Sequence, residues 1–522
     1  MTRPCRRSDL PVKYRGELEG HSMPRKLRED LSSAEFKRVS DETTMLLQQH
    51  FAAIRNAKVF PGKKPSEIAK SLEEPLPVKP QDPVRIIREV RDKILPNSTQ
   101  LGSPRYFGFV NGSGTMMSCF ADEIAAAINP NTGIWKAAPA ASEVERLVVR
   151  WLAEMIGYDT RCGGILESGG TMANVTAIAT ALHDKAGYDI VNEGLQSPQR
   201  TGKFVLYMSD HEGHSSVVKA AQLLGLGRNS VRRVKSRDDF TMDTGSLEEM
   251  INQDARAGNR PFCVVGQVGS INVGVVDPLR EIARVCNEND IWFHADGSIG
   301  AFGRIIPTKA HLFDGLELTD SVTLDPHKWL YVSYACGCVL VKDPGKLRKA
   351  FTLLSSYLRG ILPTEYSGLD YLEYGPQMSR GFTALKLWMS IKQYGVEGYR
   401  KLLERNVELA EYFDGLVNAS EEFEPMCKPV LQIYCFRYNP SRVRGPGLQI
   451  ADLNRLNQMI VDETQLTGDA FMMTTSIRGN IAIRICITNH RTTRRDIDLT
   501  FATIRRVARR LAKDVIPSVQ SL

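Results

Sequence analysis

The chain has 522 residues, 42% of them hydrophobic and 24% charged, so it can bury a large core and form two or three structural units. The net charge of +7 is small for this length, and no aromatic residues accompany the arginine-rich ends, so we expect no nucleic-acid or membrane partner. The ten cysteines lack the spacing of a zinc site, and no run of about 18 apolar residues occurs. We therefore expect a reduced, cytoplasmic protein without a signal peptide or membrane span.

Residues 1–100 are polar and punctuated by proline. Helical apolar spacing occurs over residues 33–56 and again over 83–95, with a linker rich in Pro and Lys over 61–80 between them. We expect an N-terminal helical arm that is too thin for a core of its own and wraps a neighbour or a second subunit.

From residue 101 onward, short β-prone runs alternate with helical stretches, which predicts a mostly parallel sheet covered by helices. The expected strands are 164–166, 204–208, 262–268, 291–295, 322–324 and 336–341, and the expected helices include 170–185, 215–224, 247–256 and 279–288. Ligands of such sheets bind beyond the carboxyl ends of the strands. We assign residues 101–382 to this large domain.

Residues 346–380 show little periodicity and contain several Gly and Pro residues and four tyrosines, which is typical of a mobile lid. Beyond them, residues 383–394 and 396–413 are predicted to be helical. Strand-like runs at 431–436 and 481–487 then alternate with helices at 450–464 and 495–513. The fold class is therefore α/β, with a smaller C-terminal α+β domain over residues 383–522.

Residues 321–330 contain the side chain on which the functional prediction depends. A β-prone run ends at Asp325-Pro326, and His327-Lys328 follows at once. A lysine just past a buried strand lays its stem against the core, so its ammonium is partly dehydrated and the neutral amine is more accessible. That amine can form a Schiff base with a carbonyl. Taken by itself, a lysine whose ammonium simply reaches water is the commoner case.

Two further segments follow predicted strands. Ser168-Gly169-Gly170-Thr171 lies between a strand and a helix, where free backbone N–H groups and the helix dipole can seat one phosphate. A plain connecting turn is an equal alternative. His214 follows the next strand, and its flat imidazole could stack on an aromatic ring or could hydrogen-bond the backbone at a helix start.

Two more strand ends carry polar residues. Gly269-Ser270 could place a hydroxyl near a ligand, or could be a simple turn. Asp296 ends a buried strand and needs a cationic partner, which could be a protonated pyridine nitrogen or an ordinary Arg or Lys. A single ligand that satisfies all five segments must have a phosphate, an aromatic ring, a basic ring nitrogen and an aldehyde. Pyridoxal 5′-phosphate has all four.

The chain resembles the group II pyridoxal-phosphate decarboxylases, which include aromatic L-amino-acid, glutamate, tyrosine and histidine decarboxylases. The most specific matching motif is Asp-Pro-His-Lys-Trp-Leu at residues 325–330. The other matching segments are residues 104–109, 168–174, 214–216, 294–297, 384–388 and 489–493. The resemblance extends over nearly the whole chain and implies a type I aminotransferase fold, assembled as a homodimer with active sites at the interface.

The resemblance also implies roles for individual residues. Lys328 would carry the cofactor covalently, His214 would stack over its ring, and Asp296 would pair with the ring nitrogen. The remaining cofactor-binding residues would be Gly169, Gly170, Thr171, Ser270, Asp325 and His327. A lid tyrosine would act as the acid that returns a proton after carbon dioxide leaves; the distance to Trp388 selects Tyr371, with Tyr366 and Tyr374 as alternatives. The chain has Ser298, Asp325 and Ser270 where the family often has Ala, Asn and Thr.

Phe109, Val110 and Asn111 lie in the segment that lines the substrate pocket of relatives. Their largely apolar character predicts an L-amino-acid α-decarboxylase that releases an amine and carbon dioxide from an aromatic or large apolar substrate. One alternative is a decarboxylase of an acidic amino acid. Another is an oxygen-dependent aldehyde synthase, against which Tyr371 argues. A catalytically silent scaffold is a third, and the intact set of Lys328, Asp296 and His214 argues against it.

Overall fold

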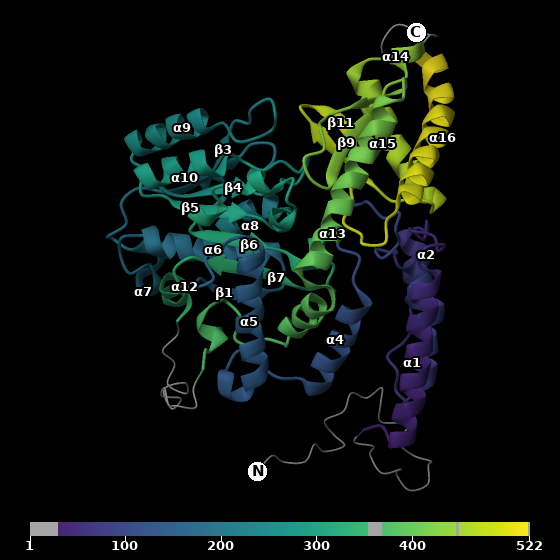
Figure 1. Ribbon diagram of the computed structural model, residues 1–522, viewed down its shortest axis with the longest axis horizontal. Helices are drawn as coiled ribbons and strands as arrows, with labels where there is room; N and C mark the ends of the chain where they lie inside the picture. Colours follow the sequence, from purple (N-terminus) through teal and green to yellow (C-terminus); the bar gives the residue numbers. More distant parts are fainter. Residues whose placement is uncertain (1–29, 353–367, 445–447, 520–522) are drawn as a thin grey trace. The chain divides into compact units, whose positions relative to one another are not determined.

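The computed structural model describes residues 30–352, 368–444 and 448–519 (Figure 1). Tyr357 and Tyr366 of the predicted lid lie outside these ranges, as do the N-terminal arginines. The chain divides into two compact units. One consists of Met1–Ala53 and Lys63–Ser98, and the other of Ile54–Gly62 and Thr99–Leu522.

The first unit is helical. It contains α1 (Ser33–Ala53), α2 (Pro65–Leu72) and α3 (Pro83–Glu89), which continues through η4 (Val90–Ile94) and η5 (Leu95–Asn97). Arg88 of α3 donates to both carboxylate oxygens of Glu42 in α1, at 3.1 and 3.0 Å. Glu42 is the only buried residue of α1, so this helix has no apolar core of its own.

A seven-stranded sheet dominates the second unit, in the order β1-β7-β6-β5-β4-β2-β3. Strands β2 to β6 run parallel in their pairings, and β7 runs antiparallel to both β6 and β1. The strands are β1 (Gly163–Glu167), β2 (Phe204–Ser209), β3 (Val231–Val234), β4 (Arg260–Gln267), β5 (Trp292–Asp296), β6 (Ser321–Leu324) and β7 (Gly337–Val341). The carboxyl ends of β1, β2, β4, β5 and β6 therefore meet at one edge of the sheet.

Helices cover both faces of this sheet. One buried cluster joins the sheet to α5 (Pro139–Met155), α9 (Thr244–Arg256), α10 (Leu279–Glu288) and the first half of α13 (Ala384–Asn418). The other joins it to α6 (Gly170–Lys185), α8 (Ser215–Leu223) and α12 (Pro344–Phe351). The shorter elements include α4 (Met116–Ile128), α7 (Ile190–Glu193), α11 (Pro326–Trp329) and η12 (Tyr371–Glu373). This arrangement confirms the predicted α/β fold with a mostly parallel sheet.

A second, antiparallel sheet has the order β10-β11-β9-β8. Its strands are β8 (Phe423–Pro425), β9 (Ile433–Tyr438), β10 (Met473–Ile477) and β11 (Asn480–Cys486). The second half of α13 packs on it together with α15 (Ile450–Thr467) and α16 (Arg494–Val519). The short α14 (Ser441–Arg444) follows β9.

The predicted strands and helices of the sheets are present with small shifts at their ends, while β3, β8 and β10 were not predicted. The helices expected over residues 383–394 and 396–413 form one element, α13, which is interrupted where Gly395 has φ 60° and ψ 171°. Within the described ranges, no helix combines the length and the apolar character needed to cross a membrane.

Two leucines on α15 provide a test of the core of the smaller sheet. Leu456 is fully buried, whereas Leu466 is 56% exposed on the same helix. Leu456→Ala removes buried methyl groups and leaves a cavity, so it is expected to lower the free energy of unfolding by about 2–5 kcal/mol. Leu466→Ala should change it by less than about 0.5 kcal/mol. Urea unfolding followed by circular dichroism measures both; equal effects would contradict the packing described.

Candidate active site

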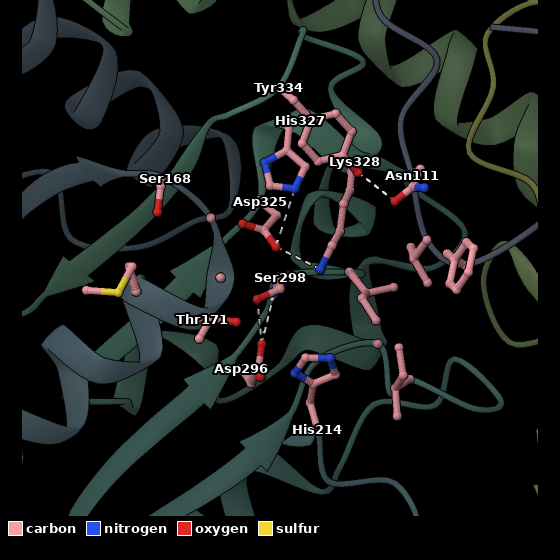
Figure 2. A pocket seen from close by; sticks show the side chains of 18 of the residues that line it. Asn111, Ser168, Thr171, His214, Asp296, Ser298, Asp325, His327, Lys328 and Tyr334 are labelled. Carbon is pink, nitrogen blue, oxygen red and sulfur yellow. Dashed lines mark hydrogen bonds and ion pairs between the residues drawn. The ribbon is translucent and has the colours of Figure 1, made fainter. Parts of the chain in front are cut away.

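Residues at five strand ends line one cavity of about 590 Å³ (Figure 2). Ser168 follows β1, His214 follows β2, Gly269 follows β4, Asp296 ends β5 and Asp325 follows β6. The walls also contain the predicted residues Gly169, Gly170, Thr171, His327, Lys328, Phe109, Val110 and Asn111. The parallel sheet thus brings together residues that lie more than 200 positions apart.

Lys328 lies on the short helix α11, which the β6 strand and Asp325-Pro326 place at the floor of the cavity. Its Nζ lies 2.7 Å from Asp325 Oδ2, and its side chain is 15% exposed. The segment that contains Phe109, Val110 and Asn111 packs directly against the backbone of α11. A Cβ on Gly112 would lie 2.2 Å from the carbonyl oxygen of His327. A glycine is therefore required at position 112, and the contact brings the neighbouring Asn111 into the cavity.

The imidazole of His327 is fixed by the strand that follows it. Its Nδ1 lies 2.7 Å from the carbonyl oxygen of Cys336, and its other nitrogen, Nε2, lies 3.9 Å from Asp325 Oδ2. Burial lowers the pKa of His327, although Asp325 opposes this effect. The ring of Tyr334 lies 4.3 Å from it, centroid to centroid.

Asp296 is a buried carboxylate that remains ionised. Its Oδ1 accepts hydrogen bonds from the hydroxyl (2.7 Å) and the backbone N–H (3.2 Å) of Ser298, and its Oδ2 accepts from Asn174 Nδ2 at 2.9 Å. Burial alone would raise the pKa of Asp296, but His214 and these hydrogen bonds outweigh it and lower the pKa below its ordinary value. Asp296 can therefore accept a hydrogen bond from a protonated ring nitrogen of a ligand.

Asn174, a fully buried residue of α6, holds this corner of the cavity together. It donates to Asp296 Oδ2 and to Ser216 Oγ, and its Oδ1 accepts from Thr323 Oγ1 at 2.7 Å. Ser216 in turn donates its backbone N–H to His214 Nδ1, at 3.2 Å. Burial lowers the pKa of His214, although Asp296 opposes this effect, and the imidazole lines the cavity.

The turn before α6 has the form of an anion seat. A Cβ on Gly170 would lie 2.6 Å from Ser298 Oγ and 2.7 Å from Asp325 Oδ2, so only glycine lets the helix start approach the cavity this closely. The first N–H groups of a helix have no partner within the helix, and they point outward with the positive end of the dipole. This is the geometry that binds a phosphate.

Three wall residues carry buried polar atoms without a hydrogen-bond partner among the described residues. They are Asp325 Oδ1, Gln267 Nε2 and Arg484 Nε. Buried polar groups of this kind are costly unless a ligand satisfies them. Together with the amine of Lys328, the ionised Asp296 and the anion seat, these atoms fit the donor and acceptor groups of pyridoxal 5′-phosphate and a substrate.

Two predicted site residues do not line this cavity. Tyr371, in η12, is 1% exposed and lies in the core beside α6 and α12, with the Arg380 guanidinium 5.0 Å from its ring centre. This corrects the expectation that Tyr371 is a lid tyrosine. Its spacing from Trp388 in the sequence agrees with the family pattern, but its ring lies in the hydrophobic core. Ser270 is also fully buried, and its hydroxyl accepts the backbone N–H of Val275 at 3.1 Å, so it closes a turn.

Other wall residues were not predicted. Tyr334 donates to Asn111 Oδ1 at 2.6 Å, and Arg484 projects from β11 of the smaller sheet. A signal for Arg484 was present, because it is the one charged residue in the apolar run 481–487. Tyr334 and Gln267 carried no such signal, since a polar group at a strand end has many possible partners.

A cavity of this kind, at the carboxyl edge of a mostly parallel sheet with a lysine, an ionised aspartate and an anion seat, defines a pyridoxal-phosphate enzyme. The family model of the pyridoxal-dependent decarboxylase conserved domain matches residues 65–439. The chain belongs to this family, and it is a pyridoxal-phosphate-dependent carboxy-lyase that acts on an amino acid.

Individual proteins are similar to this chain in sequence or in fold. The chain is 30% identical to an aromatic-L-amino-acid decarboxylase of Bacillus atrophaeus over 463 residues, which cover 89% of this chain and 93% of that protein. A solved structure of Oryza sativa TDC with PLP and tryptamine superposes with a TM-score of 0.85 at 24% identity, covering 93% and 100% of the two chains. The 4-hydroxyphenylacetaldehyde synthase of Rhodiola rosea gives a TM-score of 0.81 at 26% identity, covering 92% and 99%.

The role of Asn174 can be tested by replacing it with leucine, which has a similar size but cannot donate to Asp296. Leucine also removes the hydrogen bonds to Ser216 and Thr323, and their loss together with that of the charge-assisted bond to Asp296 should weaken cofactor binding by about 10- to 100-fold. Titration of the apoenzyme with pyridoxal phosphate, followed by absorbance, measures the dissociation constant. Asn418→Leu, at an exposed position on α13, is the control, and equal constants for the two variants would refute the role.

Proposed function

We propose that the protein decarboxylates an L-amino acid with an aromatic or large apolar side chain, releasing the amine and carbon dioxide. The observation that carries this proposal is the composition of the cavity wall. Phe109, Val110, Met172, Ile271 and Ile299 form its apolar part, and the reactive amine of Lys328 opens into the same space. The similarity to the Bacillus atrophaeus enzyme supports the same substrate class.

We propose the following roles for the residues of the cavity wall, which the family resemblance implies and the geometry supports. Lys328 would tether the cofactor covalently, and the ionised Asp296 would keep a proton on its ring nitrogen. When bound, pyridoxal phosphate supplies an electron sink for the bond that breaks at the substrate Cα. His214 would cover one face of the ring and exclude water from it. The N–H groups at Gly170 and Thr171 would hold the phosphate.

Further residues would complete the seat. Gly169 would allow the close approach of the turn, and His327 and Asp325 would border the phosphate and the lysine. Since Tyr371 lies in the core, the groups of the described cavity wall that could carry a proton to Cα include Lys328, His214 and Tyr334. Burial raises the pKa of Tyr334, so its hydroxyl keeps its proton at neutral pH.

Arg484 favours a second candidate function, the decarboxylation of an acidic amino acid. This arginine is only 7% exposed, donates one hydrogen bond to the carbonyl of Ile271, and leaves its Nε free among the described residues. A buried guanidinium suits a carboxylate ligand. Five apolar side chains line the cavity beside this one arginine, so the aromatic substrate is our first proposal.

We further propose a homodimer without a nucleic-acid or membrane partner. Met116, Phe120, Ile124 and Ile128 recur every fourth residue along α4 and are 48%, 53%, 44% and 60% exposed. Such a stripe on one face of a helix is typical of a surface that another chain covers. The nine cysteines in the described residues are free thiols, which supports a reduced, cytoplasmic location.

A product assay tests the proposed function. The holoenzyme is supplied with tyrosine, tryptophan, phenylalanine, glutamate and aspartate, and carbon dioxide, amine and oxygen uptake are measured. We expect carbon dioxide and amine in equal amounts from an aromatic substrate, without oxygen uptake. Lys328→Ala should abolish turnover and the covalent attachment of the cofactor to the chain by borohydride reduction. Lys392 is exposed, and Lys392→Ala should retain both.

Other outcomes of this assay identify the alternatives. Turnover of glutamate or aspartate that Arg484→Met abolishes would establish the acidic substrate. Oxygen uptake with release of ammonia and an aldehyde would establish an aldehyde synthase instead. A colourless protein that pyridoxal phosphate cannot reconstitute would contradict the enzyme assignment itself.

The proposed dimer is tested by Ile124→Lys, which places a charge in the stripe on α4. Burying an unpaired ammonium is costly, so the dimer dissociation constant should rise by about 100-fold or more. Sedimentation velocity over a range of concentrations measures it. Leu499→Lys is a matched control, because Leu499 of α16 is also 44% exposed. A dimer unaffected by Ile124→Lys would place the interface elsewhere.

A further inference from the structure

β1 is an outer strand of the large sheet, and two side chains lie along its open side where a neighbouring strand would pair. β1 is the first strand in the order and pairs only with β7. On its other side, the Leu166 N–H donates to Glu145 Oε1 at 3.0 Å, and the Leu166 carbonyl accepts from Arg380 Nη2 at 2.8 Å. Glu145 and Arg380 therefore offer Leu166 one acceptor and one donor, as a neighbouring strand would.

The two side chains form a buried ion pair. Arg380 Nη2 lies 2.5 Å from Glu145 Oε1, and the two side chains are 4% and 0% exposed. Removing one partner of such a pair leaves an uncompensated charge in the core. The same Nη2 atom bonds both the carboxylate and the Leu166 carbonyl, so the charge pair and the strand edge are held by a single group.

The pair connects the strand end to a distant part of the chain. Arg380 ends the segment 368–380, which is anchored where the Arg380 carbonyl accepts the N–H of Thr132 at 2.8 Å. In the same segment, a Cβ on Gly375 would lie 3.1 Å from Glu167 Oε1. This segment therefore packs along the free edge of β1.

Glu167, the last residue of β1, extends the network to α6. Its Oε1 accepts from Thr176 Oγ1 at 2.9 Å, while its Oε2 has no partner among the described residues. Thr176 lies on α6, so this bond joins the strand before the turn Ser168–Thr171 to the helix after it. The strand before the turn and the helix after it are thus joined by a contact outside the cavity.

We propose that Arg380, which lies outside the cavity, is a positioning residue that with Glu145 and Glu167 sets the geometry of the turn 168–171 and hence the affinity for the phosphate group of the cofactor. The inference rests on the proposed phosphate seat at this turn. Backbone N–H groups bind an oxyanion only in a narrow geometry. A shift of the end of β1 would therefore weaken the contacts to the phosphate while leaving Lys328 and Asp296 in place.

The test separates phosphate affinity from stability. Apoenzyme is titrated with pyridoxal phosphate and, separately, with pyridoxal, which lacks the phosphate. Arg380→Met should raise the dissociation constant of pyridoxal phosphate by about tenfold or more and leave that of pyridoxal nearly unchanged. The ³¹P resonance of the bound phosphate should shift as well. Arg380→Lys, which keeps the charge, should fold and show an intermediate effect.

Arg232→Met is the matched control. Arg232 lies on β3, the opposite edge strand, and pairs with Asp254 at 2.7 Å. This variant should also lower the thermal stability, by less than Arg380→Met because Arg232 is 30% exposed, with no change in the ratio of the two dissociation constants. If Arg380→Met and Arg380→Lys leave that ratio unchanged, or if Arg232→Met changes it equally, the positioning role is refuted.

Gly170→Ala distinguishes this inference from the assignment beneath it, because a Cβ at position 170 would lie 2.6 Å from Ser298 Oγ and disturb the seat itself. If it lowers the phosphate-specific affinity and the Arg380 variants do not, the seat is assigned correctly and the positioning role fails. If Gly170→Ala and the Arg380 variants all leave it unchanged, the phosphate binds elsewhere and both statements are overturned.

The network also predicts a pH dependence. Burial and the Glu145 charge raise the pKa of Glu167 to about 7, while Thr176 and Arg380 oppose this. The other titratable groups that interact with the cluster include Tyr371, Cys336 and Cys338. This pKa lies above that of a glutamate in the unfolded chain. The contribution of Glu167 to the free energy of unfolding is therefore complete at low pH and is lost as the pH rises through about 7.

Ionised Glu167 would then add a negative charge next to the turn. Phosphate-specific affinity should therefore fall as the pH rises through about 7. Glu167→Gln, which cannot ionise, should flatten this fall when the ratio of pyridoxal phosphate to pyridoxal affinity is measured at each pH. An identical slope in the two proteins would remove Glu167 from the network.

Discussion

A fully buried carboxylate that must stay ionised sets the requirements for the rest of the site. Burial opposes the charge on Asp296, and three donor groups from Asn174 and Ser298 compensate for it. These donors come from α6 and from the loop after β5. The charge is therefore stable only when the helix and the strands have assembled, so the chemistry of the site depends on the packing of the fold.

Asn174 shows how little freedom this arrangement leaves. Its two donors and its acceptor oxygen are all engaged, with partners on β5, β6 and the start of α8. A saturated amide in a dry core has one orientation, because either flip would leave buried groups unpaired. Asn174 thus connects the aspartate and, through Ser216, the histidine to α6, the helix that begins at the anion seat.

The sequence predicts this site well wherever a buried strand leads into it. Buried parallel strands are continuous apolar runs, so their ends, and the polar residues there, could be located. β3 escaped prediction because its sequence, Val231-Arg-Arg-Val, is half charged; Arg232 is tolerated because Asp254 pairs with it. Orientation could not be predicted either: Ser270 follows a strand as expected, but its hydroxyl faces its own turn.

Tyr371 and Arg380 show the same limit from two directions. Spacing along the chain placed Tyr371 in a lid, but only the fold reveals that its ring packs beneath the Arg380 guanidinium in the core. Arg380 gave no functional signal, since an arginine in an irregular segment is usually solvated. Its importance arises because β1 is an edge strand whose free N–H and C=O groups need partners. Sequence patterns do not show which strand will be an edge.

Phe109 in the cavity wall combines an unfavourable backbone conformation with an exposed ring. Phe109 adopts a left-handed backbone conformation, φ 51°, which costs a residue with a side chain about 1–2 kcal/mol. Its ring nevertheless remains 50% exposed, although it lines the cavity. The ring contacts Phe471 of its own chain, at 6.3 Å between centroids, and the described residues leave half of it exposed. In the proposed dimer, a second chain that covers Phe109 would complete the wall, so substrate selection would be a property of the assembled pair.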